Sequence, residues 1–174
     1  MELLFFTPAA GLFALVFAGY CMTSVLKESQ GTTKMRDLSQ AIFEGAMAYL
    51  NRQYKTLIPF TLIIFVLLYY IDGYKLAVSF LTGAICSAVA GYVGMISTTK
   101  ANARTTEAAR HSLNKALGVA FRAGAVMGMS VAGLGLFGVS TLYIIFRDPV
   151  IINSFAFGAS AIAFFARVGG GIYT

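Results

Sequence analysis

Residues 123–146 read AGAVMGMSVAGLGLFGVSTLYIIF, an unbroken run without a single charged side chain. About 20 mostly apolar residues are enough for a helix to cross the roughly 30 Å hydrocarbon core of a bilayer. Backbone polar groups inside lipid must be hydrogen-bonded within the segment, and an α-helix achieves this by itself. The run therefore predicts a transmembrane helix.

Four further stretches share this apolar character. Together with the first, the expected spans are Leu3–Leu26, Thr56–Ile71, Leu76–Ser97, Ala123–Phe146 and Pro149–Ala166. The whole chain is 58% hydrophobic and only 11% charged, whereas an average soluble domain has roughly 45–50% and 25%. The sequence predicts an all-α fold, a polytopic membrane helical bundle of about five transmembrane helices that forms a single membrane domain over residues 1–174.

Two longer segments, 27–55 and 98–122, connect these spans. From about residue 35 apolar side chains recur on one helical face, so the second span is expected to begin as a helix well before Thr56 and to leave the membrane or lie at its surface. Residues 101–120 contain no proline and only Gly118 as glycine, so they are expected to continue the helices on either side.

The first span also has the character of a cleavable signal peptide. Two features favour a retained helix instead. Glu2 stands where a signal peptide has basic residues, and the apolar run exceeds the usual 7–15 residues.

Basic residues gather in the two long connections. Ten of the 13 lie there, namely Lys27, Lys34, Arg36, Arg52, Lys55, Lys100, Arg104, Arg110, Lys115 and Arg122. Only Lys75 and Arg147 lie in the two short connections. Because cytoplasmic loops carry an excess of Lys and Arg, this predicts an N-terminus outside and a C-terminus in the cytoplasm. Charge that follows the loops argues against nucleic acid and for the lipid bilayer as the partner.

Small residues recur at four-residue spacing in two spans, as Gly83, Ser87 and Gly91 and again as Gly124 and Gly128. Such a stripe lets helix backbones approach closely. A helix–helix seam is one interpretation, and a helix that bends or slides during transport is the other. Two separate stripes suggest more neighbours than five helices supply.

Groups that could carry chemistry are sparse. The chain has no carboxylate cluster for Mg²⁺, no His/Cys ligand spacing and no nucleophile–base pair, so no catalytic, metal or substrate-binding residue is predicted in it. Cys21 and Cys86 lie in apolar runs and are expected to be packing residues. Glu44 either faces water or meets a partner within the bundle.

Arg167 differs from the other cations. It follows 18 uncharged residues, 149–166, and precedes three glycines at 169–171. One interpretation is an arginine that reaches from the end of a span to the membrane surface. The other is a buried cation that awaits a carboxylate from another helix.

Several strings resemble those of membrane-bound, ion-pumping pyrophosphatases, in order and over nearly the whole chain. They are GAMAYLNRQY (45–54), GYVGM (91–95), TKANAR (99–104), EAAR (107–110), ALGVAFRAG (116–124), VMGMSV (126–131) and RVGGGIYT (167–174).

The resemblance implies a homodimeric pump with its N-terminus outside, in a cell or inner membrane or the membrane of an acidic organelle. Such a pump hydrolyses inorganic pyrophosphate with Mg²⁺, in some cases with K⁺, and moves H⁺ or Na⁺ out of the cytoplasm. Its hydrolytic lysines and aspartates lie on later helices. The arginine that matches Arg167 belongs to its ion pathway as a gate and pairs with acidic residues of other helices.

The resemblance covers only the first third of such a pump. The chain is then a truncated product or one piece of a longer protein, and alone it is expected to be inactive as a hydrolase. Two alternatives stay open: a non-catalytic membrane scaffold or assembly fragment, and a small transporter. The absence of an internal repeat disfavours the transporter.

Overall fold

The computed structural model describes residues 3–173, with side chains from Phe6 to Arg167. It contains five α-helices: α1 (Leu3–Leu26), α2 (Thr33–Ile71), α3 (Tyr74–Ala109), α4 (Leu113–Phe146) and α5 (Val150–Tyr173). Each is long and apolar enough to cross a membrane, and no strand occurs in residues 3–173. The all-α, five-helix prediction is confirmed.

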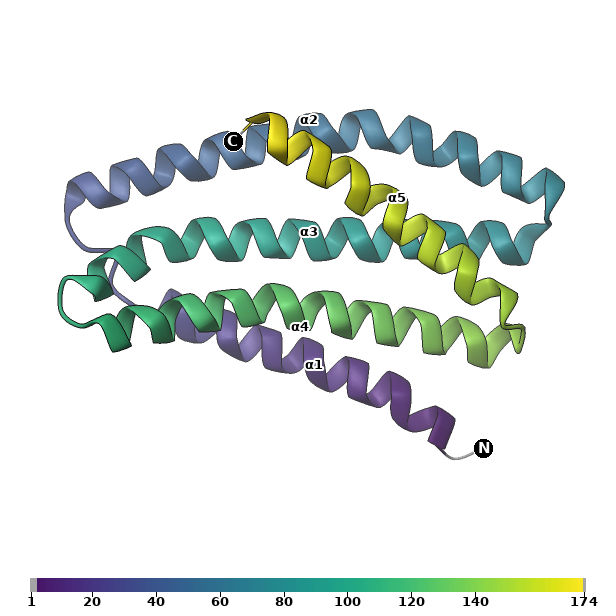
Figure 1. Ribbon diagram of the computed structural model, residues 1–174, viewed down its shortest axis with the longest axis horizontal. Coiled ribbons are helices and arrows are strands. Elements are labelled where there is room, and N and C mark those ends of the chain that lie inside the picture. Colours follow the sequence, from purple (N-terminus) through teal and green to yellow (C-terminus); the bar gives the residue numbers. More distant parts are fainter. Residues whose placement is uncertain (1–2, 174) are drawn as a thin grey trace.

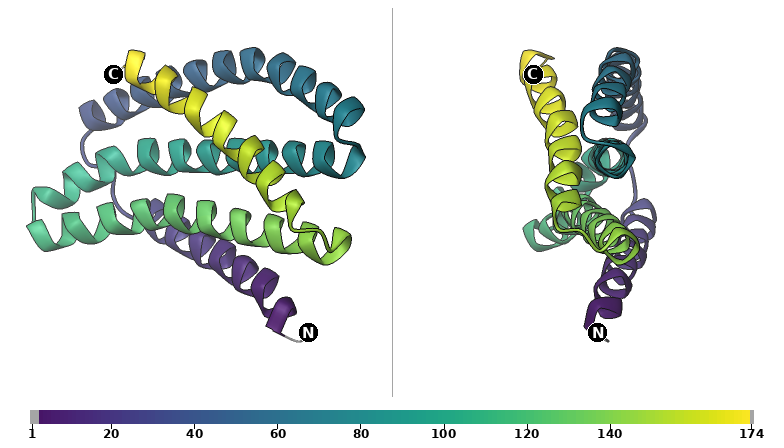
Figure 2. Two further views of the ribbon diagram at one scale, coloured as in Figure 1. Left: turned by 45° about the vertical axis from the view of Figure 1, so that its right-hand side comes forward. Right: turned by 90° about the vertical axis from the view of Figure 1, so that its right-hand side faces the viewer.

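The helices run back and forth along the length of the molecule (Figure 1). α3 lies between α2 and α4, α1 packs along α4, and α5 crosses α3 diagonally on one face (Figures 1 and 2). The α1–α2 and α3–α4 connections lie at one end, and the α2–α3 and α4–α5 connections lie at the other (Figure 1). Such an alternation is what five successive membrane crossings require.

The three central helices are much longer than a membrane span. α2 has 39 residues, α3 has 36 and α4 has 34. At 1.5 Å per residue these lengths are about 50–60 Å, well beyond the roughly 30 Å of hydrocarbon. The second long connection is helical except for residues 110–112, and the first is helical from Thr33 onward. The three helices are therefore longer than one crossing of the hydrocarbon core requires.

α3 and α5 cross at a pair of glycines. A Cβ at Gly83 would collide with the backbone carbonyl of Phe155, and a Cβ at Gly158 would collide with that of Phe80. Side chains of any size at these positions would separate the two helices, because each glycine faces backbone rather than a movable side chain. The small residue at 83 thus serves a helix–helix seam.

The other four-residue stripe behaves differently. A Cβ at Gly124 or Gly128 of α4 would meet nothing within 4 Å. Later in the same helix, Gly133 packs against α1, where a Cβ would lie 2.9 Å from the carbonyl oxygen of Gly11. One part of α4 therefore has a tightly packed neighbour and another part has open space beside its glycines.

Candidate functional site

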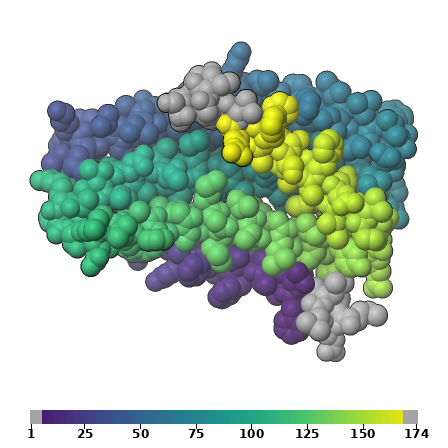
Figure 3. All heavy atoms as spheres, in the orientation of Figure 1, coloured from purple at the N-terminus to yellow at the C-terminus, as the bar shows by residue number. Residues whose placement is uncertain are grey.

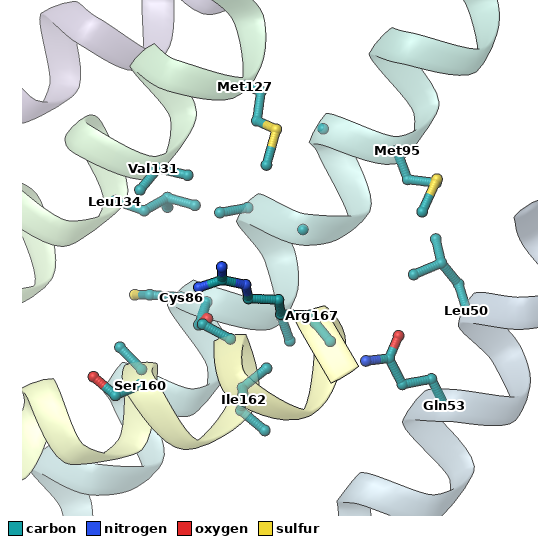
Figure 4. Close-up of a pocket in the computed structure, with 18 of the residues that line it drawn as sticks. Leu50, Gln53, Cys86, Met95, Met127, Val131, Leu134, Ser160, Ile162 and Arg167 are labelled. Carbon is teal, nitrogen blue, oxygen red and sulfur yellow. The ribbon is translucent and has the colours of Figure 1, made fainter. Parts of the chain in front are cut away.

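A cavity of about 610 Å³ lies among α2, α3, α4 and α5. Its wall is mostly apolar, with Leu50 from α2, Met95 from α3, Met127 and Val131 from α4 and Ile162 from α5 (Figure 4). In the space-filling view, α5 covers the neighbouring helices toward the α4–α5 turn (Figure 3). Arg167, Gln53 and Tyr54 are among the polar residues that line it.

Arg167 lines this cavity. Its side chain extends from α5 into the space between the helices (Figure 4). Among the residues whose side chains the structure describes, no carboxylate lies within ion-pair distance of it. α5 continues beyond it to Tyr173, so Arg167 is not at the end of its helix. Among side chains 6–167, its guanidinium therefore has no carboxylate partner, and the residue is exposed where it lines this mostly apolar cavity.

Gln53 enters the same cavity from α2 (Figure 4). Its amide nitrogen is buried and has no hydrogen-bond acceptor among residues 6–167. An unsatisfied buried amide costs about 1–3 kcal/mol, so native structures rarely leave one. This residue could not be singled out from the sequence, because its burial depends on how α3 and α5 pack against α2.

Two tyrosines of α2 bind the neighbouring helices through their hydroxyl groups. Tyr49 donates a hydrogen bond to the carbonyl oxygen of Ala166 on α5 at 3.1 Å. Tyr54 donates one to the carbonyl oxygen of Ala88 on α3 at 2.7 Å. Directional bonds therefore connect α2 to two of the three other helices that form the cavity, α3 and α5.

Of three other residues considered from the sequence, Glu44 and Cys21 do not line the cavity, whereas Cys86 does. Glu44 is exposed and accepts a hydrogen bond from Gln40 at 2.8 Å. Cys21 is buried, Cys86 is half-buried on the cavity wall, and both are free thiols. None of these groups approaches another in a way that would support nucleophilic or acid–base chemistry.

A polar cluster holds the end of α1 against α3 and α4. Arg122 of α4 donates hydrogen bonds to the Ser24 hydroxyl and to the Glu28 carboxylate, the latter at 3.2 Å, and Lys115 lies 3.7 Å from Glu28. Arg104 of α3, only 6% exposed, donates to the carbonyl oxygen of Leu26 at 3.4 Å. Cations at the C-terminus of a helix are favourable because its last carbonyls carry partial negative charge. The cluster is therefore structural.

Replacing Arg122 by Ala should lower the thermal unfolding midpoint of the detergent-solubilised chain more than Lys115→Ala does. Arg122 donates charged hydrogen bonds to two side chains, Ser24 and Glu28, and one such bond contributes at most about 1.5–3 kcal/mol to stability. An exposed ion pair such as Lys115–Glu28 contributes about 0.2–1 kcal/mol. The test compares the thermal unfolding midpoints of the two variants under the same conditions. Equal shifts for the two variants would contradict the role given to Arg122.

The acidic residues do not fit a metal site. Residues 3–173 contain no group of three or more His, Cys, Asp or Glu side chains that could hold an ion, as far as their side chains are described. Mg²⁺ requires oxygen ligands in near-octahedral geometry, usually including carboxylates. No step that depends on Mg²⁺ can be built from these residues.

Comparison with known proteins identifies the chain's relatives. Residues 12–174 match the family described as inorganic H⁺ pyrophosphatase. This chain belongs to that family. Relatives include a K⁺-insensitive pyrophosphate-energized proton pump of Methanosarcina mazei, 49% identical over 100% of this chain, and another, named as proton pump 2, of Moorella thermoacetica, 50% identical over 100% of it. A relative of Clostridium tetani, whose name describes a K⁺-stimulated pyrophosphate-energized sodium pump, is 49% identical over 97% of the chain.

The chain spans only about a quarter of the length of these pyrophosphatases: 26%, 27% and 25% of the three relatives. It corresponds to their N-terminal portion. Relatives named for H⁺ and for Na⁺ are equally similar to it, so overall identity in this segment does not distinguish the transported ion. The family resemblance found in the sequence is confirmed. The chain matches the N-terminal part of these pumps, as the resemblance implied.

Proposed function

We propose that this chain is the N-terminal part of a pyrophosphate-energised ion pump, which couples Mg²⁺-dependent diphosphate hydrolysis to the movement of H⁺ or Na⁺ out of the cytoplasm. The observation that carries the proposal is the family match over residues 12–174, together with relatives at about half identity that are named as such pumps. The five membrane-length helices agree with a segment that forms part of a pump's wall.

Within such a pump the chain supplies helix surfaces for packing and one positive charge at the cavity. Arg167, the ion-pathway gate in this proposal, places a guanidinium at the rim of a mostly apolar cavity. A fixed positive charge in a weakly polar space repels a cation that would rest there and attracts carboxylates, because Coulomb interactions strengthen as the dielectric constant falls. Arg167 would therefore keep a passing cation from stopping and would pair with acidic groups of other helices.

The complete pump is expected to be a homodimer that uses Mg²⁺, in some members with K⁺, and binds inorganic pyrophosphate outside this segment. The segment itself lies in the bilayer of a cell or inner membrane, or of an acidic organelle, with its first helix entering from outside and its last ending in the cytoplasm. The gathering of ten basic residues in the connections at one end supports this orientation.

The isolated chain should release no phosphate from pyrophosphate. Its described acidic residues form no ligand group for Mg²⁺, and hydrolysis of a highly charged diphosphate needs such a centre. Phosphate release is measured with the purified chain in liposomes containing Mg²⁺, and empty liposomes provide the control. Phosphate release well above that control would refute the proposal that the hydrolytic site lies outside this chain.

A chimera tests the function itself. Here residues 1–174 replace the matching N-terminal quarter of the Methanosarcina mazei pump, to which the chain is 49% identical. We expect the chimera to hydrolyse pyrophosphate and to acidify membrane vesicles, because the segment would restore a wall of the same shape. A chimera that reaches the membrane, hydrolyses pyrophosphate and moves no ion would contradict the proposal.

A non-catalytic scaffold is the second candidate function. The open space beside Gly124 and Gly128 of α4 favours it, because small residues without a neighbour are typical of a surface to which another helix docks. A scaffold would need no charge at Arg167. The two functions are therefore distinguished by whether transport in the chimera depends on that side chain.

A further inference from the structure

We propose that Tyr49 is a positioning residue that holds α5 at Ala166 so that Arg167 faces the cavity. The inference rests on the proposed function, since it gives Tyr49 a part in ion movement only if Arg167 has one. Its basis is the hydrogen bond from the Tyr49 hydroxyl to the carbonyl oxygen of Ala166, the residue directly before Arg167, at 3.1 Å.

α5 needs such a link because of its diagonal course. Its backbone meets that of α3 most closely, as far as the glycines show, at Gly83 and Gly158, eight residues before Ala166. Beyond that crossing it diverges from α3 and passes over toward α2 (Figures 1 and 2). At about 1.5 Å per residue, Arg167 lies more than 13 Å along the helix from the crossing. The seam with α3 therefore does not fix its position closely.

The apolar contacts between α2 and α5 do not set the rotation of α5. Ile162 packs in a cluster with Leu57 of α2, and the Phe165 ring lies edge-on to Phe60 at 5.0 Å between centroids. Hydrophobic contact is non-directional and tolerates sliding and turning. Successive residues of a helix are about 100° apart, so a turn of one residue would move Arg167 out of the cavity.

The Tyr49 bond has the directionality that these contacts lack. A helical carbonyl oxygen has two lone pairs, so Ala166 can accept the phenol proton beside a backbone hydrogen bond. The bond fixes both the height and the rotation of α5 next to the guanidinium. A partly buried tyrosine hydroxyl needs a partner, and Tyr49→Phe removes the one hydrogen bond between α2 and α5 that occurs among the described side chains.

Tyr54 provides a matched control. It lies on the same helix and makes the same kind of bond, but to Ala88 of α3 rather than to α5. Its replacement by Phe also removes one hydroxyl from α2. A general weakening of the bundle would appear in both variants, whereas a change in the position of Arg167 should appear only in Tyr49→Phe.

The first experiment measures position in this chain. Spin labels are attached at Arg167→Cys and Arg52→Cys, with Cys21 and Cys86 replaced by Ser, and the distance distribution is recorded in lipid nanodiscs. A hydrogen bond between membrane helices changes the equilibrium between the bonded and the displaced arrangement about threefold on average. Tyr49→Phe should therefore raise about threefold the population of molecules whose label distance differs from the main one. Tyr54→Phe should leave the distribution unchanged. Identical distributions for the Tyr49→Phe variant and its parent would overturn the inference.

The second experiment measures coupling in the chimera. Tyr49→Phe should lower the number of ions moved per pyrophosphate while phosphate release continues, and Tyr54→Phe should keep the parental ratio. A parallel fall of transport and hydrolysis in Tyr49→Phe would show a merely structural role and overturn the inference. A shifted distance distribution together with normal pumping by Arg167→Ala would instead refute the ion-pathway role proposed for Arg167 and leave Tyr49 as the tether of α5.

Discussion

Arg167→Ala in the chimera is expected to abolish pyrophosphate-driven ion uptake or to uncouple it from phosphate release. The substitution removes the charge that Arg167 adds to the rim of the cavity, so a cation would no longer be repelled there and the acidic groups of other helices would lose their partner. Uptake into inverted vesicles is measured with an ion-sensitive dye, and phosphate release is measured in the same preparation.

Arg36→Ala is the matched control for Arg167→Ala. It removes an exposed arginine from the part of α2 that precedes the expected span. Uptake should then stay near the level of the parent chimera. Normal coupled uptake by Arg167→Ala would show that the ion-pathway role is wrong, even if the chain still forms part of the pump's wall.

Gly83→Ala and Gly158→Ala should each strongly destabilise the folded chain. Each added methyl group would meet a backbone carbonyl of the opposite helix, which cannot move aside as a side-chain end can. Overpacking of this kind costs about 1–3 kcal/mol, and here the two helices must also separate. The measurement is the fraction of detergent-solubilised chain that stays monodisperse after heating.

Gly128→Ala controls for the change of residue type. A Cβ at Gly128 meets nothing within 4 Å, so only the better helix propensity of alanine remains, which favours folding by up to about 1 kcal/mol. Gly128→Ala should therefore be neutral or slightly stabilising in this chain. If all three variants lost stability to the same extent, the α3–α5 crossing described above would be wrong.

The number and type of the helices could be predicted from the sequence because they depend on local properties. The uncharged run at 123–146 is long enough for a span whatever surrounds it, and α4 contains all of it. The stripes of small residues were also visible, but their partners were not. Gly83 and Gly128 belong to stripes of the same spacing, yet only Gly83 meets another backbone, because helix crossing angles depend on the whole set of contacts.

The candidate site was predictable only at one residue. Arg167 stands out because a charge after 18 uncharged residues is costly in lipid. Gln53 and Tyr49 were part of a string that resembles the family, but nothing in the string showed that the amide would be buried or that the phenol would reach α5. Those facts arise from the diagonal course of α5 between helices far apart in the chain.

Membrane topology tests the central claim, that this chain crosses the bilayer five times with its long basic connections in the cytoplasm. Single cysteines are placed at Ser29, Asp72, Ser112 and Asp148, one in each connection, in a chain without Cys21 and Cys86. Membrane-impermeant maleimide is then applied to right-side-out and inverted vesicles. Positions 72 and 148 should react only from outside, and positions 29 and 112 only from the cytoplasmic side. Reaction of positions 72 and 112 from the same side would contradict the claim, because α3 would then not cross the membrane.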